Sequence, residues 1–581
     1  MGDHPVSAER ILTLRVLSAL LREDLLGLRT LSVPVRRTDG SWLRLDRDGS
    51  STLLLPVAED GFQCEYAARL PLLEVDGVQL ETLDGVLAAL RELAEPEDRG
   101  GHDAFAEECR QTLATMELHD KVRPEVLAAL AARYGGDPAQ WSGLGASLAQ
   151  DTLAAYLDHP VYPTARGRAD LTEDQLSAYA PEFHPSFLLR WFAVPVGTFD
   201  LHTEEPLPDW WPTPEAIGLP ELAEGHLTVP VHPLTAGAPL TDALREAGLE
   251  GVAVPGPTPY LEVVPTLSMR TVAVARDPRC HLKLPLATAT LGMRNRRTIK
   301  AGVLPDGAAG QRLLETVIGL EPRFTATILH ADEQSYGEGG HELLAVLLRR
   351  YPEGMEDAVT VPLASLAATA PGGRLVVDHL ADRFYDGDHL ALYDAFLTLL
   401  LDWQTTLFRY GIALESHQQN TSLVFDRADG ATRLRLLYKD NDGLRINGSR
   451  LNAALGEFAP APKEFDDARI FADSDRPLTD LFTTITGHLC AASLAFALSA
   501  QDRIPLETSL GLLRERLSQA VDRLRGDGAA LRADLLDADR LPVKAMVTAG
   551  TLLSKQRSGA ADINKHYTSG PNYLRPAKVA R

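Results

Sequence analysis

The sequence predicts a multidomain α+β protein, and three observations support this fold class. The chain has 581 residues, which exceeds the size at which a single hydrophobic core stops growing. Residues 8–28 repeat apolar side chains at helical spacing, whereas residues 156–365 hold short apolar runs punctuated by proline, as in VPVHP and HLKLPL. Long apolar helical patterns return after that region. These changes predict three domains, at residues 1–155, 156–365 and 366–581.

The first predicted domain is helical, with a small antiparallel meander. The meander is expected around residues 33–57, because Asp39-Gly40 and Asp48-Gly49 are favoured hairpin turns. Further helices are expected at 104–118 and 125–134. In the last domain, helices are expected at 389–410, 481–500 and 509–525, with a strand-loop-strand unit at 411–446.

The charge and cysteine content limit the classes of partner. Acidic residues outnumber basic ones 80 to 57, for a net charge of -23, which argues against a general nucleic-acid binder. An anionic small molecule would need a local basic cluster inside a cleft. The four cysteines form no CxxC pair and lie near no histidine at zinc-finger spacing. Buried thiols in a reducing cytoplasm are expected rather than disulfides or a zinc site.

One segment has the length of a membrane span. Residues 481–501 carry no formal charge, but they include three threonines, His488 and Ser493, which are unfavourable in hydrocarbon. A helix buried in a large domain is the better interpretation. The first residues, MGDHPVSAER, contain no apolar stretch typical of a signal peptide. The protein is therefore expected to be cytoplasmic, without a membrane partner.

The most informative chemical unit is GIALESHQQNTSLVF (411–425) followed by LRLLYKDNDGLRI (434–446). Its loop presents Glu415, His417 and Asn420, and its second predicted strand ends at Asp440. Carboxylate and amide oxygens suit an Mg²⁺ ion bound to a nucleotide phosphate, and protein kinases hold their metals with a similar Asn and Asp. The alternative is that the loop and the DNDG turn are only structural.

A basic unit spans residues 264–300. Ser268 and Arg270 are predicted to share one face of a strand, and Lys283 to end an antiparallel return strand. Three more arginines follow in RNRR, at 294–297. Hydroxyl, ammonium and guanidinium groups on paired strands would form a cradle for phosphate or carboxylate. The alternative is a solvated basic face at a strand end.

A third unit combines residues 157–183 with VPVHP at 229–233. Its basic side chains lie on proline-stiffened loops, whose rigidity lowers the cost of ordering around a ligand; they are His159, Arg166, Arg168 and His232. Each histidine alone is more often structural than functional. The sequence has no GxxxxGK[ST], no GxGxxG after a strand, no HExxH and no GxSxG. ATP, if used, would be held by another scaffold.

Several motifs, taken in order, resemble the IucA/IucC family of siderophore synthetases that work independently of non-ribosomal peptide synthetases. They are DHPVYPTARGR from Asp158, YAPEF, VPVHP, PTLSMRT, LKLPL, LESHQQN and Lys439-Asp440. The resemblance spans residues 156–446. It implies a cupped-hand fold with an N-terminal thumb, sheet-rich fingers and a palm distantly like a kinase lobe. It also implies a homodimer, with ATP between fingers and palm.

The resemblance assigns roles by motif position. It places the ATP phosphates near Ser268, Arg270, Thr271, Lys283 and Arg294, with His417 and Asn420 on the phosphate or the acyl-adenylate. It places Mg²⁺ on Glu415 and Asp440, and the substrate carboxylate near His159, Arg166, Arg168 and His232. The catalytic set would be Arg270, Lys283 and His417, with His417 as a candidate proton acceptor.

The implied activity is that of a Mg-ATP-dependent ligase. It would adenylate a citrate-like carboxylic acid, join it to an amine, hydroxylamine or alcohol, and release AMP and pyrophosphate. In the first motif, Asp158 stands for Gly and Arg166 for Lys. Two other departures, Tyr162 for His and Leu234-Thr235 for Trp-Gln, favour an unusual acid or amine. The alternatives are a kinase-like phosphotransferase, which would form ADP, and a non-catalytic metabolite-binding paralogue.

Overall fold

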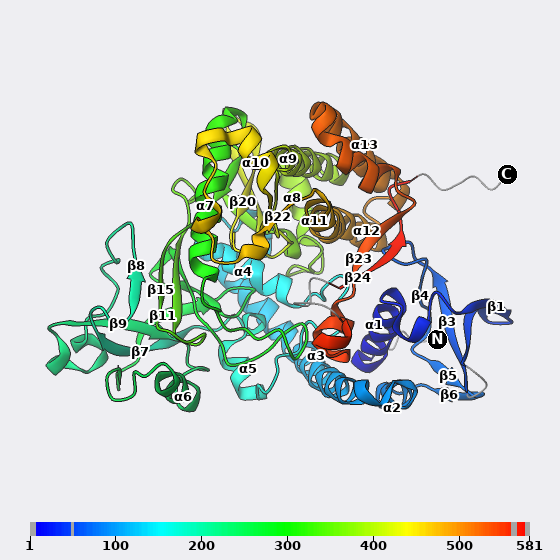
Figure 1. The fold of residues 1–581 in the computed structure, drawn as a ribbon, viewed down its shortest axis with the longest axis horizontal. Helices are drawn as coiled ribbons and strands as arrows, with labels where there is room; N and C mark the ends of the chain where they lie inside the picture. The colour runs from blue at the N-terminus through cyan, green and yellow to red at the C-terminus, as the bar shows by residue number, and fades with distance from the viewer. Residues whose placement is uncertain (1–6, 48–50, 559–565, 576–581) are drawn as a thin grey trace.

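The computed structural model describes residues 7–47, 51–558 and 566–575. A six-stranded N-terminal sheet and a nine-stranded sheet lie at opposite sides of the molecule, with the helices of the last third between and above them (Figure 1). The architecture mixes helices with sheets that are mostly antiparallel, as expected for an α+β protein.

The N-terminal region contains the predicted meander. Its sheet has the order β1-β2-β3-β5-β6, with β4 paired to β3, and the pairs are antiparallel. Thr38 and Asp39 form the turn between β1 and β2, and Gly40 is the first residue of β2, whereas Asp48-Gly49 lies outside the described residues. The strands are β1 (Val33–Arg37), β2 (Gly40–Arg47), β3 (Ser51–Glu59), β4 (Tyr66–Ala68), β5 (Leu73–Val75) and β6 (Val78–Leu80). Helices α1 (Ala8–Arg22), α2 (Leu83–Leu93), α3 (Arg99–Tyr134) and α4 (Leu144–Ala155) accompany them.

Two helix predictions in this region were wrong in extent. Helix α1 ends at Arg22 rather than near residue 28, because Asp24 and Leu26 adopt positive φ angles of 58° and 56°, which end a right-handed helix. The helices expected at 104–118 and 125–134 form one helix, α3, with Pro124 inside it. Proline removes one backbone hydrogen bond, and the long helix continues through that loss.

The central region is organised around the nine-stranded sheet. Its order is β10-β7-β11-β12-β13-β16-β15-β8, and β9 pairs with β7. The strands are β7 (Phe187–Pro195), β8 (Asp200–His202), β9 (His226–Val231), β10 (Val254–Pro255), β11 (Tyr260–Pro265), β12 (Thr271–Val274), β13 (Asp277–Lys283), β15 (Asp332–Glu338) and β16 (Ala345–Arg350). Helices α5 (Glu173–Tyr179) and α6 (Ala238–Glu246) flank it. The antiparallel β12–β13 pair, with Thr271 opposite Lys283, confirms the predicted return strand.

A four-stranded sheet carries the strand-loop-strand unit of the last region. Its order is β14-β20-β19-β17, formed by β14 (Ile328–His330), β17 (Val359–Pro362), β19 (Thr421–Ala428) and β20 (Ala431–Tyr438). It therefore takes strands from both sides of residue 365. Helix α7 (Val303–Leu320) lies next to it in Figure 1. A three-stranded sheet adds β18 (Ile412–Ala413), β21 (Arg445–Asn447) and β22 (Phe471–Ala472).

Helices of the last third cover these sheets. They include α8 (Val376–Phe384), α9 (His389–Arg409), α10 (Gly448–Leu455) and α13 (Leu506–Arg523). The segment Arg476–Ala500 joins α11 (Arg476–Leu481), a π-helix (Phe482–Ala492) and α12 (Ser493–Ala500). It alone among the described helices is long and apolar enough to cross a membrane, yet 83% of its most apolar window is buried. The expected core helix fits this burial, and all four cysteines are buried free thiols.

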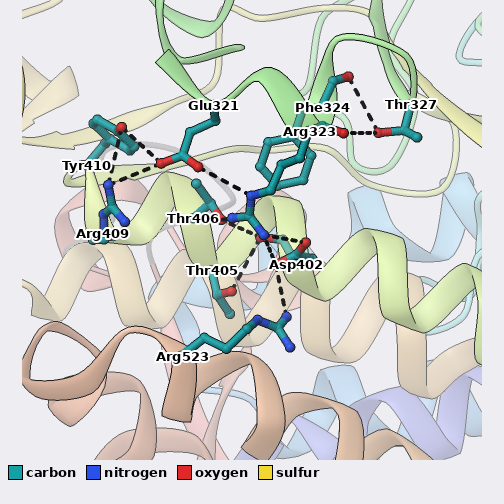
Figure 2. Close-up of polar contacts among 10 residues, drawn as sticks. All are labelled: Glu321, Arg323, Phe324, Thr327, Asp402, Thr405, Thr406, Arg409, Tyr410 and Arg523. Atoms are coloured by element: carbon teal, nitrogen blue, oxygen red, sulfur yellow. Dashed lines mark hydrogen bonds and ion pairs between the residues drawn. The ribbon is translucent and has the colours of Figure 1, made fainter. Parts of the chain in front are cut away.

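An ion-pair network on the outside of α9 ties three helical segments together (Figure 2). Arg323 follows α7 and donates to both carboxylate oxygens of Asp402, at 3.0 and 2.8 Å. Arg523, at the end of α13, donates to the same carboxylate at 2.9 Å. Glu321 accepts hydrogen bonds from Arg409 and Tyr410, each at 3.1 Å. These side chains are partly exposed, so solvent screens the network and limits its contribution to stability.

The end of the chain returns to the N-terminal region. Strands β23 (Arg540–Lys544) and β24 (Tyr567–Pro571) pair antiparallel beside the first sheet (Figure 1). A Cβ on Gly570 would lie 2.1 Å from the carbonyl oxygen of Gln63, so only glycine permits this approach. The buried Glu23 carboxylate, just after α1, accepts the backbone N–H groups of Val547 and Thr548 at 2.9 and 2.8 Å. It thereby caps a short π-helix, Thr548–Leu552.

We predict that Glu23→Ala destabilises the protein by about 2 to 3 kcal/mol, because buried backbone donors lose their acceptor. Arg323→Ala, which removes a partly exposed ion pair, should cost about 1 kcal/mol or less. The midpoints of urea unfolding, followed by circular dichroism, compare the two. Equal losses would show that the Glu23 contact is no stronger than the surface network.

Candidate functional site

One cavity, with a volume of about 690 Å³, opens between the nine-stranded sheet, the four-stranded sheet and the returning C-terminal segment. Its wall brings together ten of the residues that the sequence singled out. They are His159, Arg166, Arg168, Ser268, Arg270, Lys283, Glu415, His417, Asn420 and Asp440. Thr271, Arg294 and His232 do not line it.

A tight turn between β11 and β12 positions two of these residues. Ser268 and Arg270 lie on this turn rather than on the predicted strand, because β12 begins only at Thr271. The Ser268 hydroxyl accepts the backbone N–H of Thr271 at 3.1 Å. Arg270 donates to the carbonyl oxygen of Thr298 at 2.8 Å. Its guanidinium is therefore anchored to the backbone of an adjacent loop while it faces the cavity.

The basic run RNRR contributes Arg297 to the cavity and not Arg294. Arg297 lines the wall close to Arg270. Arg294 instead donates to the carbonyl oxygens of Ala549 at 3.2 Å and of Leu553, and so holds the C-terminal segment. Burial, together with the positive charge of Arg270, lowers the pKa of Arg297. An anion in the cavity would relieve that repulsion.

The metal candidate Asp440 is held by cations from the nine-stranded sheet. Lys283 and Arg349 donate to its Oδ1 at 2.7 and 2.6 Å. Lys283 also lies 3.4 Å from Oδ2 of Asp442. Burial raises the pKa of Asp440, but Lys283 and then Arg349 outweigh it and hold that pKa well below its usual range. Asp440 is therefore ionised at neutral pH.

The loop between β18 and β19 presents the other predicted ligands. Its turn is closed by the N–H of His417, which donates to the carbonyl of Glu415 at 3.1 Å, and by the N–H of Asn420, which donates to the carbonyl of His417 at 2.9 Å. Glu415 packs against the turn after Asp440, since a Cβ on Gly443 would lie 2.6 Å from Glu415 Oε2. The two predicted carboxylates thus face the same cavity from neighbouring loops.

His417 is neutral in this site. Burial lowers its pKa, although the carboxylates of Glu415 and Asp440 oppose the shift. The backbone N–H of Gln419 donates to Nδ1 at 3.3 Å, which assigns the remaining proton to Nε2. In this tautomer His417 offers a hydrogen-bond donor to a ligand. The geometry therefore favours a donor over the proton acceptor that the sequence suggested.

The loop that carries the predicted acid-binding residues has its charges already paired. Arg166 donates to Asp158 at 2.8 Å, and Arg168 donates to the buried carboxylate of Glu182 at 3.1 Å. His159 accepts two backbone N–H groups on Nδ1. Burial and the nearby His417 lower its pKa to about 3. This wall therefore offers hydrogen bonds and a local ion pair rather than a cluster of unpaired cations.

His232 and Tyr162 are core residues. His232 is fully buried between the rings of Tyr179 and Phe187, with centroids at 5.4 and 5.1 Å. Tyr162 is also fully buried and donates its hydroxyl to Glu108 at 3.0 Å. Leu234 lies in the turn that His232 closes and does not reach the cavity. The family departures at Tyr162 and Leu234 thus alter how loops are anchored rather than the cavity wall.

Three charged cavity residues received no individual role from the sequence. They are Arg297, which was included only as part of the basic run, Asp442 and Lys544. Arg297 and Asp442 stand in the runs RNRR and DND. The composition of these runs indicated a charged site, but it did not indicate which of their residues face the cavity. Lys544 lies 3.6 Å from Glu415 but more than one hundred positions later in the chain, so no local pattern connects them.

The carboxylates of this cavity fit a hard cation shared with a ligand. Among the described residues, no group of three or more His, Cys, Asp or Glu side chains could hold a metal alone. Mg²⁺ is commonly bound by one or two carboxylates together with water and substrate phosphates. Asp440 and Glu415 provide such oxygen ligands, beside the cations Arg270, Lys283 and Arg297.

Comparisons with known proteins found similar sequences and similar folds. The profile of the IucA / IucC family matches residues 149–368, and that of the ferric iron reductase FhuF-like transporter matches residues 394–558. Staphyloferrin B synthase of Staphylococcus aureus (strain NCTC 8325 / PS 47) is 22% identical, over 97% of this chain and 98% of its own.

Two solved structures share the fold. The petrobactin biosynthesis protein AsbB from Bacillus anthracis str. Sterne superposes with a TM-score of 0.76 at 17% identity, covering 98% of this chain and 95% of its own. ATP-bound aerobactin synthetase IucA from Klebsiella pneumoniae gives 0.70 at 17% identity, covering 98% and 100%. By these matches the chain is similar to the IucA / IucC family over residues 149–368 and shares its fold with proteins of siderophore biosynthesis.

Proposed function

We propose that this protein is an ATP-dependent ligase of the AMP-forming, acid-amine type. It adenylates a citrate-like carboxylic acid and condenses the acyl-adenylate with an amine, hydroxylamine or alcohol, releasing AMP and pyrophosphate in siderophore or related biosynthesis. One observation carries the proposal: Arg270, Lys283 and Arg297 face the same cavity as the carboxylates of Asp440 and Glu415. A polyphosphate needs such cations, and its metal needs such carboxylates.

The side chains of this cavity supply binding and charge stabilisation. Arg270, Lys283 and Arg297 would bind the phosphates and neutralise the charge that passes to pyrophosphate when the substrate carboxylate attacks the α-phosphorus in line. The hydroxyl of Ser268 and the amide of Asn420 would orient the same groups. His417, neutral with its proton on Nε2, would donate a hydrogen bond where negative charge develops.

We further propose that Asp440 and Glu415 hold Mg²⁺, which when bound withdraws charge from the phosphates. The finer architecture that we propose is a cupped hand with a thumb, fingers and a kinase-like palm. We also propose that the protein acts in the cytoplasm as a homodimer on small-molecule carboxylic acid and amine substrates. The heavy burial of the apolar segment Arg476–Ala500 supports a soluble enzyme.

The products of ATP test the proposal. We predict that the purified protein, given Mg-ATP, a panel of citrate-like and dicarboxylic acids and hydroxylamine, forms a hydroxamate and releases AMP and pyrophosphate in equal amounts. Hydroxylamine captures the acyl-adenylate even where the natural amine is missing, so only the acid must be correct. Hydroxamate is measured colorimetrically and the nucleotides by chromatography. A kinase-like phosphotransferase would accumulate ADP instead, and a non-catalytic paralogue would consume no ATP with any acid.

Two arginines of the same run provide a matched pair. We predict that Arg297→Ala lowers kcat/KM for ATP at least about tenfold, because a charge-assisted contact with the phosphates is lost. Lys283→Ala and Arg270→Ala should give losses of similar size. Arg294→Ala removes the same charge three positions away, but it should mainly lower the unfolding temperature, since Arg294 anchors Ala549 and Leu553. Equal kinetic losses at 294 and 297 would contradict the assignment.

The protonation state of His417 gives a pH prediction. Because burial lowers the pKa of His417 below its ordinary value of 6.5, the neutral form should dominate at pH 6.5 and above. We expect kcat to stay level from pH 8 down through pH 6.5, and any loss caused by His417 to begin only at lower pH. A pH profile of wild type and His417→Ala measures this. A His417-dependent decline centred at or above pH 6.5 would contradict the burial argument.

A further inference from the structure

Asp440 lies in an unfavourable backbone conformation that its surroundings must hold. Its φ angle is +59°, in the left-handed region that residues other than glycine seldom adopt. Such strain persists only where neighbouring contacts over-determine the conformation. The contacts of Asp440 fall into two groups of different chemical character, a buried support and a single lysine.

The support consists of Glu333 and Arg349, both buried on adjacent strands β15 and β16. Glu333 Oε1 accepts the backbone N–H of Asp440 at 2.9 Å, and Oε2 accepts the N–H of Asn441 at 3.4 Å. Arg349 joins the two carboxylates: its Nε donates to Glu333 at 2.7 Å and its Nη2 to Asp440 at 2.6 Å. The planar guanidinium is suited to span both. Arg349 does not line the cavity, so a ligand there need not disturb it.

Lys283 differs because it faces the cavity. Its ammonium lies between Asp440 and Asp442, at 2.7 and 3.4 Å, where its single positive charge offsets part of the negative charge of the two carboxylates. A compact ammonium on a flexible stem can change partners more readily than a guanidinium locked in a fork. The two interactions with Asp440 should therefore respond differently when charged ligands enter.

We propose that Glu333 and Arg349 form a permanent support for Asp440, whereas Lys283 is an exchangeable partner that holds the place of the divalent cation. This inference rests on the ATP-binding function proposed above. A metal that binds Asp440 and Glu415 without nucleotide must displace the ammonium from Asp440. A polyphosphate alone would draw Lys283 away and leave Asp440 and Asp442 facing further negative charge. Together they let Lys283 move to phosphate while the metal takes its place, so the two affinities are coupled.

Metal binding without nucleotide tests the exchange. We expect Mn²⁺, used as the probe for Mg²⁺, to bind Lys283→Met at least about tenfold more tightly than wild type, because the competing charge within 4 Å of the carboxylates is gone. The intensity of the free Mn²⁺ signal in electron paramagnetic resonance gives both dissociation constants. Should Lys283→Met fail to fold by circular dichroism, Lys283→Gln of similar length replaces it.

Two further variants separate the roles. Arg297→Met makes the same change of charge in the same cavity without a direct contact to Asp440, and it should change Mn²⁺ affinity by less than about threefold. Arg349→Lys keeps its charge but cannot span Glu333 and Asp440. Added to Lys283→Met, it should abolish the gain in affinity.

The outcomes distinguish the parts of the argument. Unchanged Mn²⁺ affinity in a folded Lys283 variant, or an equal gain in Arg297→Met, would overturn the exchange. A gain that survives Arg349→Lys would overturn the permanent support. Calorimetry of Mg-ATP with wild type is independent of these measurements: absence of binding there would overturn the proposed function itself.

Discussion

The ion pairs that Lys283 and Arg349 form with Asp440 join the two sheets across the cavity, and the arrangement of the site depends on them. Lys283 and Arg349 belong to the nine-stranded sheet, and Asp440 follows β20 of the four-stranded sheet. Burying three charges costs more free energy than their attraction commonly returns. Such a network is therefore poorly explained as a device for stability. The network is better explained by the binding of a charged ligand, which needs opposite charges in the cavity.

The last segment of the chain also lines the cavity, and acidic side chains of the N-terminal region hold that segment in place. Glu23 caps the π-helix that begins at Thr548. Glu108 of α3 accepts the hydroxyl of Thr551 at 3.0 Å. Through these contacts, Glu23 and Glu108 of the N-terminal region orient the segment that brings Lys544 to the cavity. Regions at the two ends of the chain thus build one site.

The sequence predicted those parts of the site that short-range rules govern. The return strand ending at Lys283 follows from alternation and turn chemistry, and the presence of Glu415 and Asp440 in one cavity follows from a strand pair joined to a loop. Short-range rules do not predict which of Arg294 and Arg297 faces the cavity, because that depends on the path of an irregular loop. There the N–H of Arg297 donates to Thr288 and its carbonyl accepts from Leu286. Such pairings leave no periodic pattern in the sequence.

Burial explains the remaining differences between expectation and structure. The predicted acid-binding set treated each histidine and arginine as a potential ligand, yet His232 is enclosed by aromatic rings and Arg168 is committed to the carboxylate of Glu182. Asp158, which stands where the family pattern has glycine, neutralises Arg166 directly. The positive charge that this cavity can present to an anion is therefore concentrated around Arg270 and Arg297. A carboxylate substrate would be drawn to the same end of the cavity as the phosphates, which is where its attack on the α-phosphorus must occur.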